Sequence, residues 1–305
     1  MAAGAAVTVL EARDRIGGRI WTSRHWPDLP MDLGASWIHG TEGNPLTKLA
    51  EAASAARLET SYDAVMALDA TGQEVELSAD HALAEDLIDK ARSRAETRAA
   101  DQSLAEAIRA TTRWKAADDA RRARLSRILN GMIAAEYGGD TDEVSAWCFD
   151  ESEEFDGEDA PFPGGHDQII QLLASGLTIR TGAIVTQVAQ DGAGIRVALA
   201  DGETLSADRV VVTVPLGALK SVFGIDFPAP IDAQITRWSQ DPFTHGACSF
   251  NATGTTPETR EALAGTDWDG RIVFVGEAAS RDCWGTAHGA VFSGREAAET
   301  LADQD

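Results

Sequence analysis

The sequence predicts an α/β protein with two domains, and three observations favour this class. Residues 5–19 have the pattern of a short, apolar strand that is expected to be buried, followed by an acid, two glycines and an arginine. Residues 271–298 have the pattern of a second buried strand, a Gly-Glu pair and a helix. Residues 81–136 are rich in Ala, Arg, Asp, Glu and Leu, which favours two or three helices. We therefore expect an α/β body interrupted by a helical insert.

The first strand and the loop after it indicate a dinucleotide site. Glu11 ends the strand, and an acid at the end of the second strand of a dinucleotide-binding βαβ unit accepts hydrogen bonds from a ribose. Gly17 and Gly18 lack the Cβ atoms that would keep a backbone away from a pyrophosphate, and Arg19 adds positive charge. The G-x-G-x-x-G fingerprint that normally opens such a unit occurs nowhere in the chain. We therefore expect the chain to begin in the middle of a cofactor site.

The second strand predicts a place for negative charge. It ends in Gly276 and Glu277, and a helix is expected to begin shortly afterwards, near residues 285–287. The start of a helix presents free N–H groups and a partial positive charge to whatever lies beyond the strand end. An electron-rich ligand group would suit this position.

The remaining elements follow in chain order. A helix is expected from about Pro45, with Asn44 as its N-cap. A glycine turn at residues 162–165 leads into another helix. Residues 177–214 hold several strands separated by two Asp-Gly turns, and they end in a strand, Val210–Val214, that is expected to be buried.

The composition is that of a globular protein with a strongly acidic balance. Of 305 residues, 44% are hydrophobic and 25% charged, and the formal net charge is −23. This charge argues against nucleic acid binding, and it favours a cationic ligand or serves only solubility. No apolar run reaches the length of a membrane span, so no membrane contact is expected, and the start lacks a secretory signal.

The cysteines indicate a reducing environment. They are odd in number, far apart and without the spacing of a metal site: Cys148, Cys248 and Cys283. We therefore expect no metal ion and a cytoplasmic location. The sequence does not indicate an oligomeric state.

Five blocks in chain order resemble the flavin-containing amine oxidases, especially the polyamine oxidase branch. They are Val9–Arg19, Asp32–Leu46, Phe162–Ile170, Val210–Lys220 and Ile235–Gly294. The resemblance implies a discontinuous, Rossmann-like FAD-binding domain formed by residues 1–60, 160–225 and 265–305. It implies a second, mixed substrate domain with a helical insert, formed by residues 61–159 and 226–264. The implied partners are FAD, a small-molecule amine and dioxygen.

The resemblance also assigns roles to single residues. The residues it places against FAD are Glu11, Arg13, Gly17, Gly18, Arg19, Gly34, Ala35, Ser36, Trp37, Gly164, Val185, Gly276, Glu277, Thr286 and Ala287. Those it places at the reaction are His39, which would orient the amine or tune its protonation, Trp238 against the flavin ring, and Thr286 beside the amine. Cys248 and Thr286 stand where the family often has aromatic residues, with Phe250 as a substitute. A structural role for His39 is the alternative.

An acidic run has two interpretations. Its members are Asp150, Glu151, Glu153, Glu154, Asp156, Glu158 and Asp159. The run is either a solvated loop or an electrostatic entrance that concentrates a polycation such as spermine.

Two departures from the family pattern leave three functions open. The pyrophosphate loop is absent, and residues 227–230 are followed almost at once by Ile235, where the family has a long piece of substrate domain. That piece includes a lysine near flavin N5, and Lys220 belongs to a different block. The sequence is compatible with an FAD-dependent amine oxidase, active or impaired, with a non-catalytic interaction protein of the same fold, and with another flavin oxidase such as an amino acid oxidase.

Overall fold

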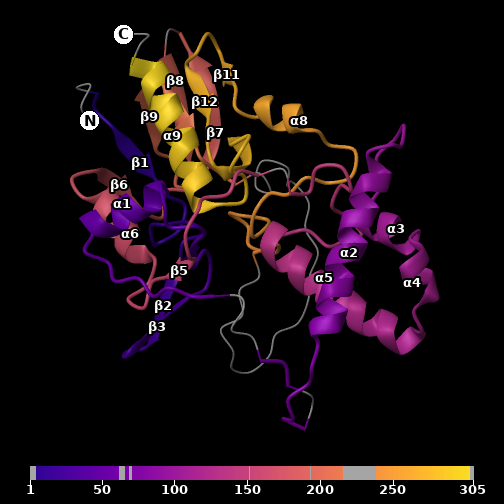
Figure 1. Ribbon diagram of the computed structural model, residues 1–305. Coiled ribbons are helices and arrows are strands. Elements are labelled where there is room, and N and C mark those ends of the chain that lie inside the picture. The colour runs from indigo at the N-terminus through magenta and orange to yellow at the C-terminus, as the bar shows by residue number, and fades with distance from the viewer. Residues whose placement is uncertain are drawn as a thin grey trace. The chain divides into compact units, whose positions relative to one another are not determined.

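The computed structural model describes residues 5–61, 66–68, 71–150, 152–192, 194–215 and 238–302. Glu151, Lys220, residues 227–230 and residues 235–237 lie outside this part. The chain divides into two compact units (Figure 1). Unit 1 comprises residues 1–60, 153–247 and 261–305, and unit 2 comprises residues 61–152 and 248–260. The assignment of one domain to the cofactor and another to the substrate stays a prediction.

Unit 1 is a mixed α/β structure that contains two parallel strand pairs. Strand β1 (Thr8–Leu10) pairs in parallel with β6 (Thr178–Arg180). Strand β10 (Val210–Val212) pairs in parallel with β12 (Ile272–Phe274), and β11 (Thr266–Asp267) is antiparallel on the other side of β12. The carboxyl ends of β1 and β12 lead into the two motifs that the sequence singled out.

The burial of these strands differs from the prediction. Ile272 and Val273 of β12 are buried, as expected. The expectation that the first strand and the strand Val210–Val214 are buried is wrong, because Val9 is 36% exposed and Val211 is 46% exposed. Parallel strands are buried when helices cover both faces of a wide sheet. Each described parallel ladder is only two or three strands wide, so part of its apolar surface stays open.

Unit 1 also contains a three-stranded antiparallel meander. It consists of β7 (Val185–Asp191), β8 (Gly194–Leu199) and β9 (Thr204–Ala207). Gly192 and Gly202 have φ angles of +62° and +92°, so the two predicted Asp-Gly turns are confirmed. The alternating residues of β8 form the core of this sheet: Ile195, Val197 and Leu199.

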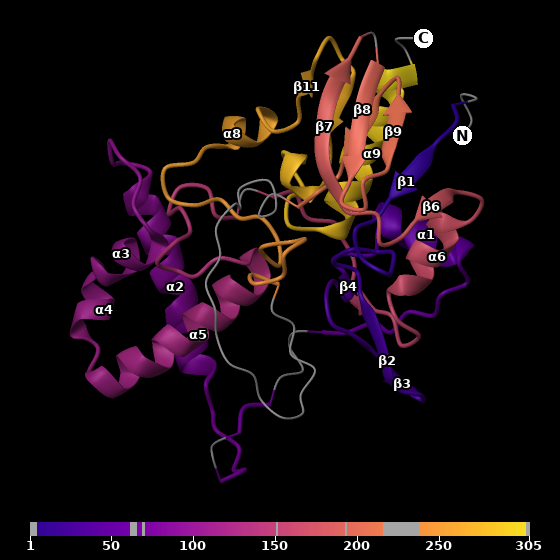
Figure 2. The same ribbon diagram turned by 180° about the vertical axis from the view of Figure 1, so that it is seen from behind.

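Three helices of unit 1 support the candidate site: α1 (Pro45–Ala52), α6 (Asp167–Ala174) and α9 (Ala287–Ala302). The predicted cap of α1 is confirmed, because Asn44 Oδ1 accepts a hydrogen bond of 3.0 Å from Leu46 N–H. Figure 1 shows α9 on the near side of the meander strands, and Figure 2, from behind, shows those strands in front of it. A buried cluster holds this region together: Ile38, Leu46, Ala50, Ala55, Phe162 and Ile169.

Unit 1 also contains two short antiparallel strand pairs, of which the second brings distant segments together. Strands β2 (Thr22–Trp26) and β3 (Leu29–Asp32) form a hairpin directly after the glycine loop. Strand β4 (Trp37–Ile38) pairs with β5 (Ala160–Pro161), more than 100 residues later. The second pairing places the residues after β4 beside those before β5.

Unit 2 is helical. It contains α2 (Ser78–Ala95), α3 (Leu104–Arg109), α4 (Thr112–Ala116) and α5 (Asp119–Tyr137), and α8 (Pro257–Glu261) ends at its border. The prediction of two or three helices for residues 81–136 is therefore corrected to four. The reason is local capping, because side chains that accept N–H hydrogen bonds start new helices at short intervals: Ser103, Thr111 and Asp118. Within the described ranges, no helix combines the length and apolar character that a membrane span needs.

Candidate active site

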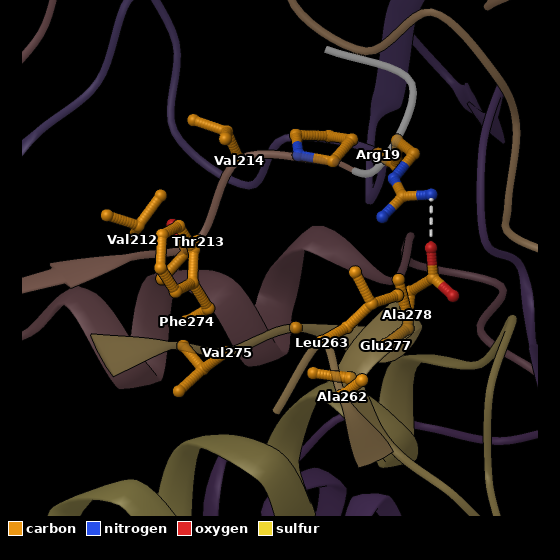
Figure 3. A pocket seen from close by; sticks show the side chains of 13 residues that line it. Arg19, Val212, Thr213, Val214, Ala262, Leu263, Phe274, Val275, Glu277 and Ala278 are labelled. Carbon is orange, nitrogen blue, oxygen red and sulfur yellow. Dashed lines mark hydrogen bonds and ion pairs between the residues drawn. The ribbon is translucent and has the colours of Figure 1, made fainter. Parts of the chain in front are cut away.

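The site in unit 1 is built around an ion pair between the two predicted motifs. Arg19 Nη1 lies 2.8 Å from Glu277 Oε1, and Figure 3 shows this contact. The other carboxylate oxygen, Oε2, accepts a hydrogen bond of 2.8 Å from the backbone N–H of Gly285. Only 6% of the Glu277 side chain is exposed. Its charge therefore depends on Arg19 for compensation.

A cavity of about 200 Å³ opens beside this ion pair (Figure 3). Arg19 and Glu277 form the charged part of the cavity wall, and the apolar part includes Val212, Val214, Leu263 and Phe274. Gly276 also lines the cavity with a φ of +138°, and no atom would lie within 4 Å of a Cβ at this position. Ligand pockets usually measure roughly 300 to 1,000 Å³, so this cavity fits only part of a dinucleotide.

Gly34 packs against the backbone of Arg19, and Trp238 lies beside Gly34. The Ala35 N–H donates a hydrogen bond of 3.1 Å to the Arg19 carbonyl, and a Cβ atom at Gly34 would overlap that carbonyl. The Trp238 ring reaches to 3.4 Å from the same Cβ position, and its Nε1–H donates to the Leu33 carbonyl at 3.2 Å. Ser36 Oγ in turn donates to the Gly34 carbonyl. The close backbone approach to Arg19 is by itself a reason for glycine at position 34.

The predicted ribose-binding segment lies next to Trp238. Arg13 forms an ion pair of 2.6 Å with Asp241 and lies 5.9 Å from the Trp238 ring centroid. Glu11 Oε1 accepts a hydrogen bond of 2.8 Å from Arg13 N–H, and Oε2 has no hydrogen-bond partner among the described residues. The turn at residues 182–183 donates to the carbonyls of Arg13 and Glu11, two residues before Val185. Glu11 therefore keeps one free acceptor for a hydroxyl.

Gly17 and Gly18, which lie between Arg13 and Arg19, have backbone conformations that favour glycine. Gly17 and Gly18 have φ angles of +97° and +56°, and no atom would lie within 4 Å of a Cβ at Gly18. Arg15 Nη1 donates to the Gly18 carbonyl at 2.8 Å. Partial burial and the charge of Arg13 lower the pKa of Arg15. The guanidinium group of Arg15 therefore lies beside backbone that is open at Gly18.

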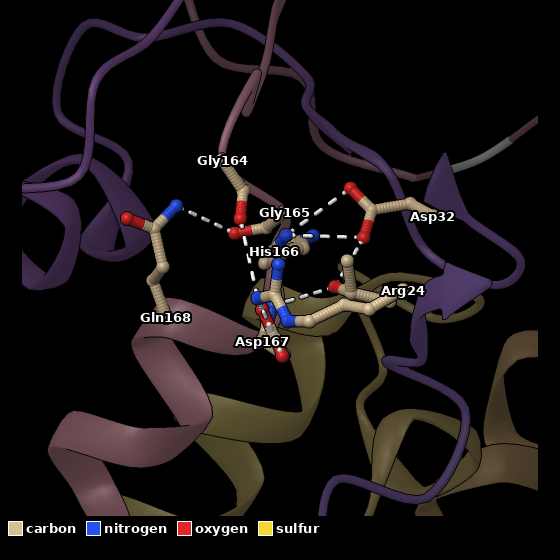
Figure 4. A network of polar contacts seen from close by, with 8 residues as sticks. Arg24, Asp32, Gly164, Gly165, His166, Asp167 and Gln168 are labelled. Carbon is tan, nitrogen blue, oxygen red and sulfur yellow. Dashed lines mark hydrogen bonds and ion pairs between the residues drawn. The ribbon is translucent and has the colours of Figure 1, made fainter. Parts of the chain in front are cut away.

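A buried polar network supports the predicted cofactor-facing glycine turn (Figure 4). The backbone N–H of His166 donates to both oxygens of Asp32 at 3.1 Å, and His166 Nδ1 lies 3.1 Å from the Ala35 carbonyl. Gly164 and Gly165 immediately precede His166, and Gly165 has a φ of +95°. Burial lowers the pKa of His166, although Asp32 acts in the opposite direction. The network ties the glycine turn to residues 32–35.

His39 follows strand β4 and contacts one residue of the acidic run. Its Nδ1 lies 2.9 Å from Asp159 Oδ2, and the backbone N–H of Gly40 donates to Asp159 Oδ1 at 2.8 Å. About half of the His39 side chain is exposed. Trp37, two residues earlier, is 43% exposed and donates from Nε1 to Thr60 Oγ1.

Thr286 acts at the start of α9. Its hydroxyl donates to the Cys283 carbonyl at 2.7 Å and accepts from the Gly289 N–H at 3.0 Å. This arrangement satisfies one free N–H at the helix start, next to Ala287. The polar contacts of the Thr286 hydroxyl are therefore within its own segment, and its place beside an amine stays a prediction.

His288 of α9 is 4% exposed and lies edge-on to the ring of Phe155 at a centroid distance of 5.2 Å. Burial and the neighbouring His39 lower the pKa of His288 to about 4. In the unfolded chain a histidine titrates near pH 6.5. Between these values the unfolded state binds more protons, so the free energy of unfolding falls as the pH falls.

We expect acidification from about pH 6.5 to about pH 5 to lower the free energy of unfolding by about 2 to 3 kcal/mol. The contribution of His288 is complete above about pH 6.5 and is lost as the pH falls toward about 4. Urea unfolding at several pH values measures this effect. His288→Met should lose roughly half of this pH dependence, because His166 also stays neutral through burial. An unchanged slope in that variant would contradict the assignment.

The structure therefore brings most of the predicted residues into one connected region of unit 1. The sequence of contacts runs from Arg13 through Trp238 and Gly34 to Arg19 and Glu277. Val185 is connected to this region only through the turn at residues 182–183, which donates hydrogen bonds to the carbonyls of Arg13 and Glu11. No sequence pattern indicated the contacts of three residues: Asp159, which stands out only as one acid of a run, Asp241 and His166. The described residues include no group of His, Cys, Asp or Glu placed to hold a metal ion.

A family model described as flavin containing amine oxidoreductase matches this chain in two segments, residues 1–227 and 219–302. The chain belongs to the flavin-containing amine oxidoreductase family. The place where the two matched segments meet is close to residues 227–235, where the sequence departs from the family pattern.

Several named plant proteins are similar to this chain. Polyamine oxidase 2 of Arabidopsis thaliana is 30% identical over 236 residues, which cover 70% of this chain and 47% of the relative. Polyamine oxidase 4 of Oryza sativa subsp. japonica is 31% identical, with coverage of 70% and 47%. Protein FLOWERING LOCUS D of Arabidopsis thaliana is 24% identical over 417 aligned positions, with coverage of 98% and 52%. The chain thus spans about half the length of these relatives, and the last alignment is longer than the chain, so this relative has internal segments without a counterpart here.

Proposed function

We propose that this chain is an FAD-dependent amine oxidase that acts on a polyamine-like substrate. The observation that supports this most is the meeting of four distant segments at one place in unit 1. Arg19, Gly34, Trp238 and Glu277 are connected by direct contacts, although they are more than 250 residues apart at the extremes. Membership of the flavin-containing family supports FAD as the ligand.

The residues present fit part of this cofactor. The open face of Gly276 and the cavity beside Arg19 leave room for a ligand to approach the backbone. Glu11 keeps one free carboxylate oxygen for a ribose hydroxyl, in a Rossmann-like arrangement. Gly18, with its open backbone, and Arg19 would face the pyrophosphate. Trp238 and residues 34–37 would lie along the ring system, Gly164 would approach it, and Thr286 and Ala287 would present the start of α9 to it.

The chemistry follows from this arrangement. When bound, a flavin supplies a hydride acceptor and later passes the electrons to dioxygen, which yields hydrogen peroxide. The protein binds and orients the amine and controls its protonation. His39 would hold the amine nitrogen, because its ring is half-exposed and is held by Asp159 on one side only. The acidic residues before β5 would attract a polycation, and the names of two relatives support a polyamine.

The visible spectrum of the purified 305-residue protein, after addition of FAD and removal of the excess, tests this proposal. We expect retained flavin absorption that bleaches when spermine is added without oxygen. A bound flavin that an amine cannot bleach would contradict amine oxidation by this chain. A colourless protein would contradict cofactor binding.

The absence of a G-x-G-x-x-G loop supports a second candidate function. That loop supplies backbone N–H groups to the pyrophosphate in Rossmann-type sites. A chain without it could be a non-catalytic interaction protein of the same fold, and the colourless outcome would favour this candidate. An amino acid oxidase would instead require an arginine clamp for a carboxylate. Bleaching by an amino acid but not by spermine would identify that case.

A further inference from the structure

We propose that Asp159 is a positioning residue that fixes the tautomer and direction of His39, so that His39 Nε2 accepts a proton or hydrogen bond from the substrate ammonium group. This inference rests on the proposed amine oxidase function but concerns a residue to which no role in that reaction has been given. It starts from the contacts of the Asp159 carboxylate.

Both oxygens of this carboxylate are used, and both hold the segment after β4. Oδ1 accepts from the Gly40 N–H at 2.8 Å, and Oδ2 lies 2.9 Å from His39 Nδ1. The Asp159 side chain is only 16% exposed, whereas four other acids of the run are exposed: Glu153, Glu154, Asp156 and Glu158. The backbone carbonyl of Asp159 also accepts from the Thr60 N–H at 2.8 Å. Asp159 is therefore held by two neighbouring segments, residues 39–40 through its carboxylate and Thr60 through its backbone carbonyl.

The protonation state of the ring follows from this geometry. A carboxylate only accepts hydrogen bonds, so a neutral His39 must carry its proton on Nδ1 and keep a lone pair on Nε2. His39 is 52% exposed in its side chain, so the Nε2 side of the ring is open to a ligand. An ammonium group donates hydrogen bonds or a proton, and the lone pair on His39 Nε2 can accept them.

The remaining neighbours of the His39 ring support this role. His288 of α9 interacts with it electrostatically, and burial with this interaction lowers the pKa of His288 to about 4. His288 is therefore neutral at physiological pH and does not repel a cation that approaches His39. The carboxylate of Asp159 in turn stabilises the imidazolium that forms when His39 takes a proton.

The test uses the matched substitution Asp159→Asn, which keeps the shape of the side chain. The Gly40 N–H still requires the amide oxygen, so the amide NH₂ group has to face His39 Nδ1. The variant should therefore move the ring proton from Nδ1 to Nε2. ¹⁵N NMR of histidine-labelled protein at pH 8 measures this directly, because protonated and unprotonated ring nitrogens have well-separated shifts. His39→Ala identifies the signals.

We expect an Nδ1–H tautomer in the unsubstituted protein and an Nε2–H tautomer in Asp159→Asn. Glu158→Gln removes the same charge from the neighbouring exposed position and should leave the tautomer unchanged. An Nε2–H tautomer in the unsubstituted protein, or an Nδ1–H tautomer in Asp159→Asn, would overturn the proposal. The NMR spectrum of the unsubstituted protein shows by itself whether His39 carries its proton on Nδ1, even if the variant folds poorly.

Turnover gives a second readout in protein that retains FAD. Asp159→Asn should lower kcat/KM for spermine by about 10- to 100-fold, because Nε2 can no longer accept a proton. Asp208→Asn, which removes an exposed charge outside the acidic run, should stay within about 2-fold of the unsubstituted protein. An unchanged kcat/KM would contradict the role in catalysis. Failure to bind FAD would contradict the proposed function, but it would leave the NMR result valid.

Discussion

Replacing Arg19 with methionine is expected to lower the free energy of unfolding by about 3 kcal/mol. The substitution keeps much of the side-chain volume but removes the cation beside Glu277, whose side chain is 6% exposed. Removing one partner of a buried ion pair typically costs about 3 to 5 kcal/mol, because the remaining charge stays in a poorly solvated position. Urea unfolding without FAD measures this cost separately from any loss of cofactor.

Two further variants determine whether the loss of stability in Arg19→Met comes from the broken ion pair or from the lost side-chain packing. Arg24→Met removes the exposed pair with Asp167, in which the arginine side chain is 51% exposed, and should cost about 1 kcal/mol or less. Adding Glu277→Gln to Arg19→Met should recover about 2 kcal/mol, because no buried charge is then left. A loss below 1 kcal/mol in Arg19→Met would mean that water compensates Glu277.

Gly34→Ala is the second substitution with a large expected effect. A Cβ atom at this position would overlap the Arg19 carbonyl oxygen and lie 3.4 Å from the Trp238 ring. Backbone cannot yield as a flexible side chain can, so the segment has to move away from Arg19. We expect the free energy of unfolding to fall by about 2 to 4 kcal/mol, and retained FAD to decrease with it.

The control for this prediction is an alanine substitution in the same unit. Gly294 lies within α9, and no atom would lie within 4 Å of its Cβ. Gly294→Ala should therefore raise the free energy of unfolding by about 0.5 to 1 kcal/mol through helix propensity. If Gly34→Ala were as stable as the unsubstituted protein, the close approach between residues 19 and 34 would be wrong.

Much of unit 1 could be predicted because its information is local. The Asn44 cap, the Asp-Gly turns and the strand–Gly–Glu–helix succession at residues 272–302 each depend on residues a few positions apart. The glycine and arginine motif after β1 was also recognisable by its spacing alone. The helical insert was predicted in class but not in number, because capping residues such as Ser103 divide it into short helices.

The sequence by itself determined the class of the fold, the order of its elements and the family to which the chain is similar. The tertiary structure decided which side chains meet. The pairing of β4 with β5 places Asp159 against His39 across 120 positions, and nothing in an acidic run distinguishes that one carboxylate from its neighbours. Burial also depends on tertiary contacts. Val9 and Val273 both lie in short apolar strands, but Val9 is 36% exposed and Val273 only 6%. Patterns of a few residues report local geometry, whereas contacts and solvation depend on segments that only folding brings together.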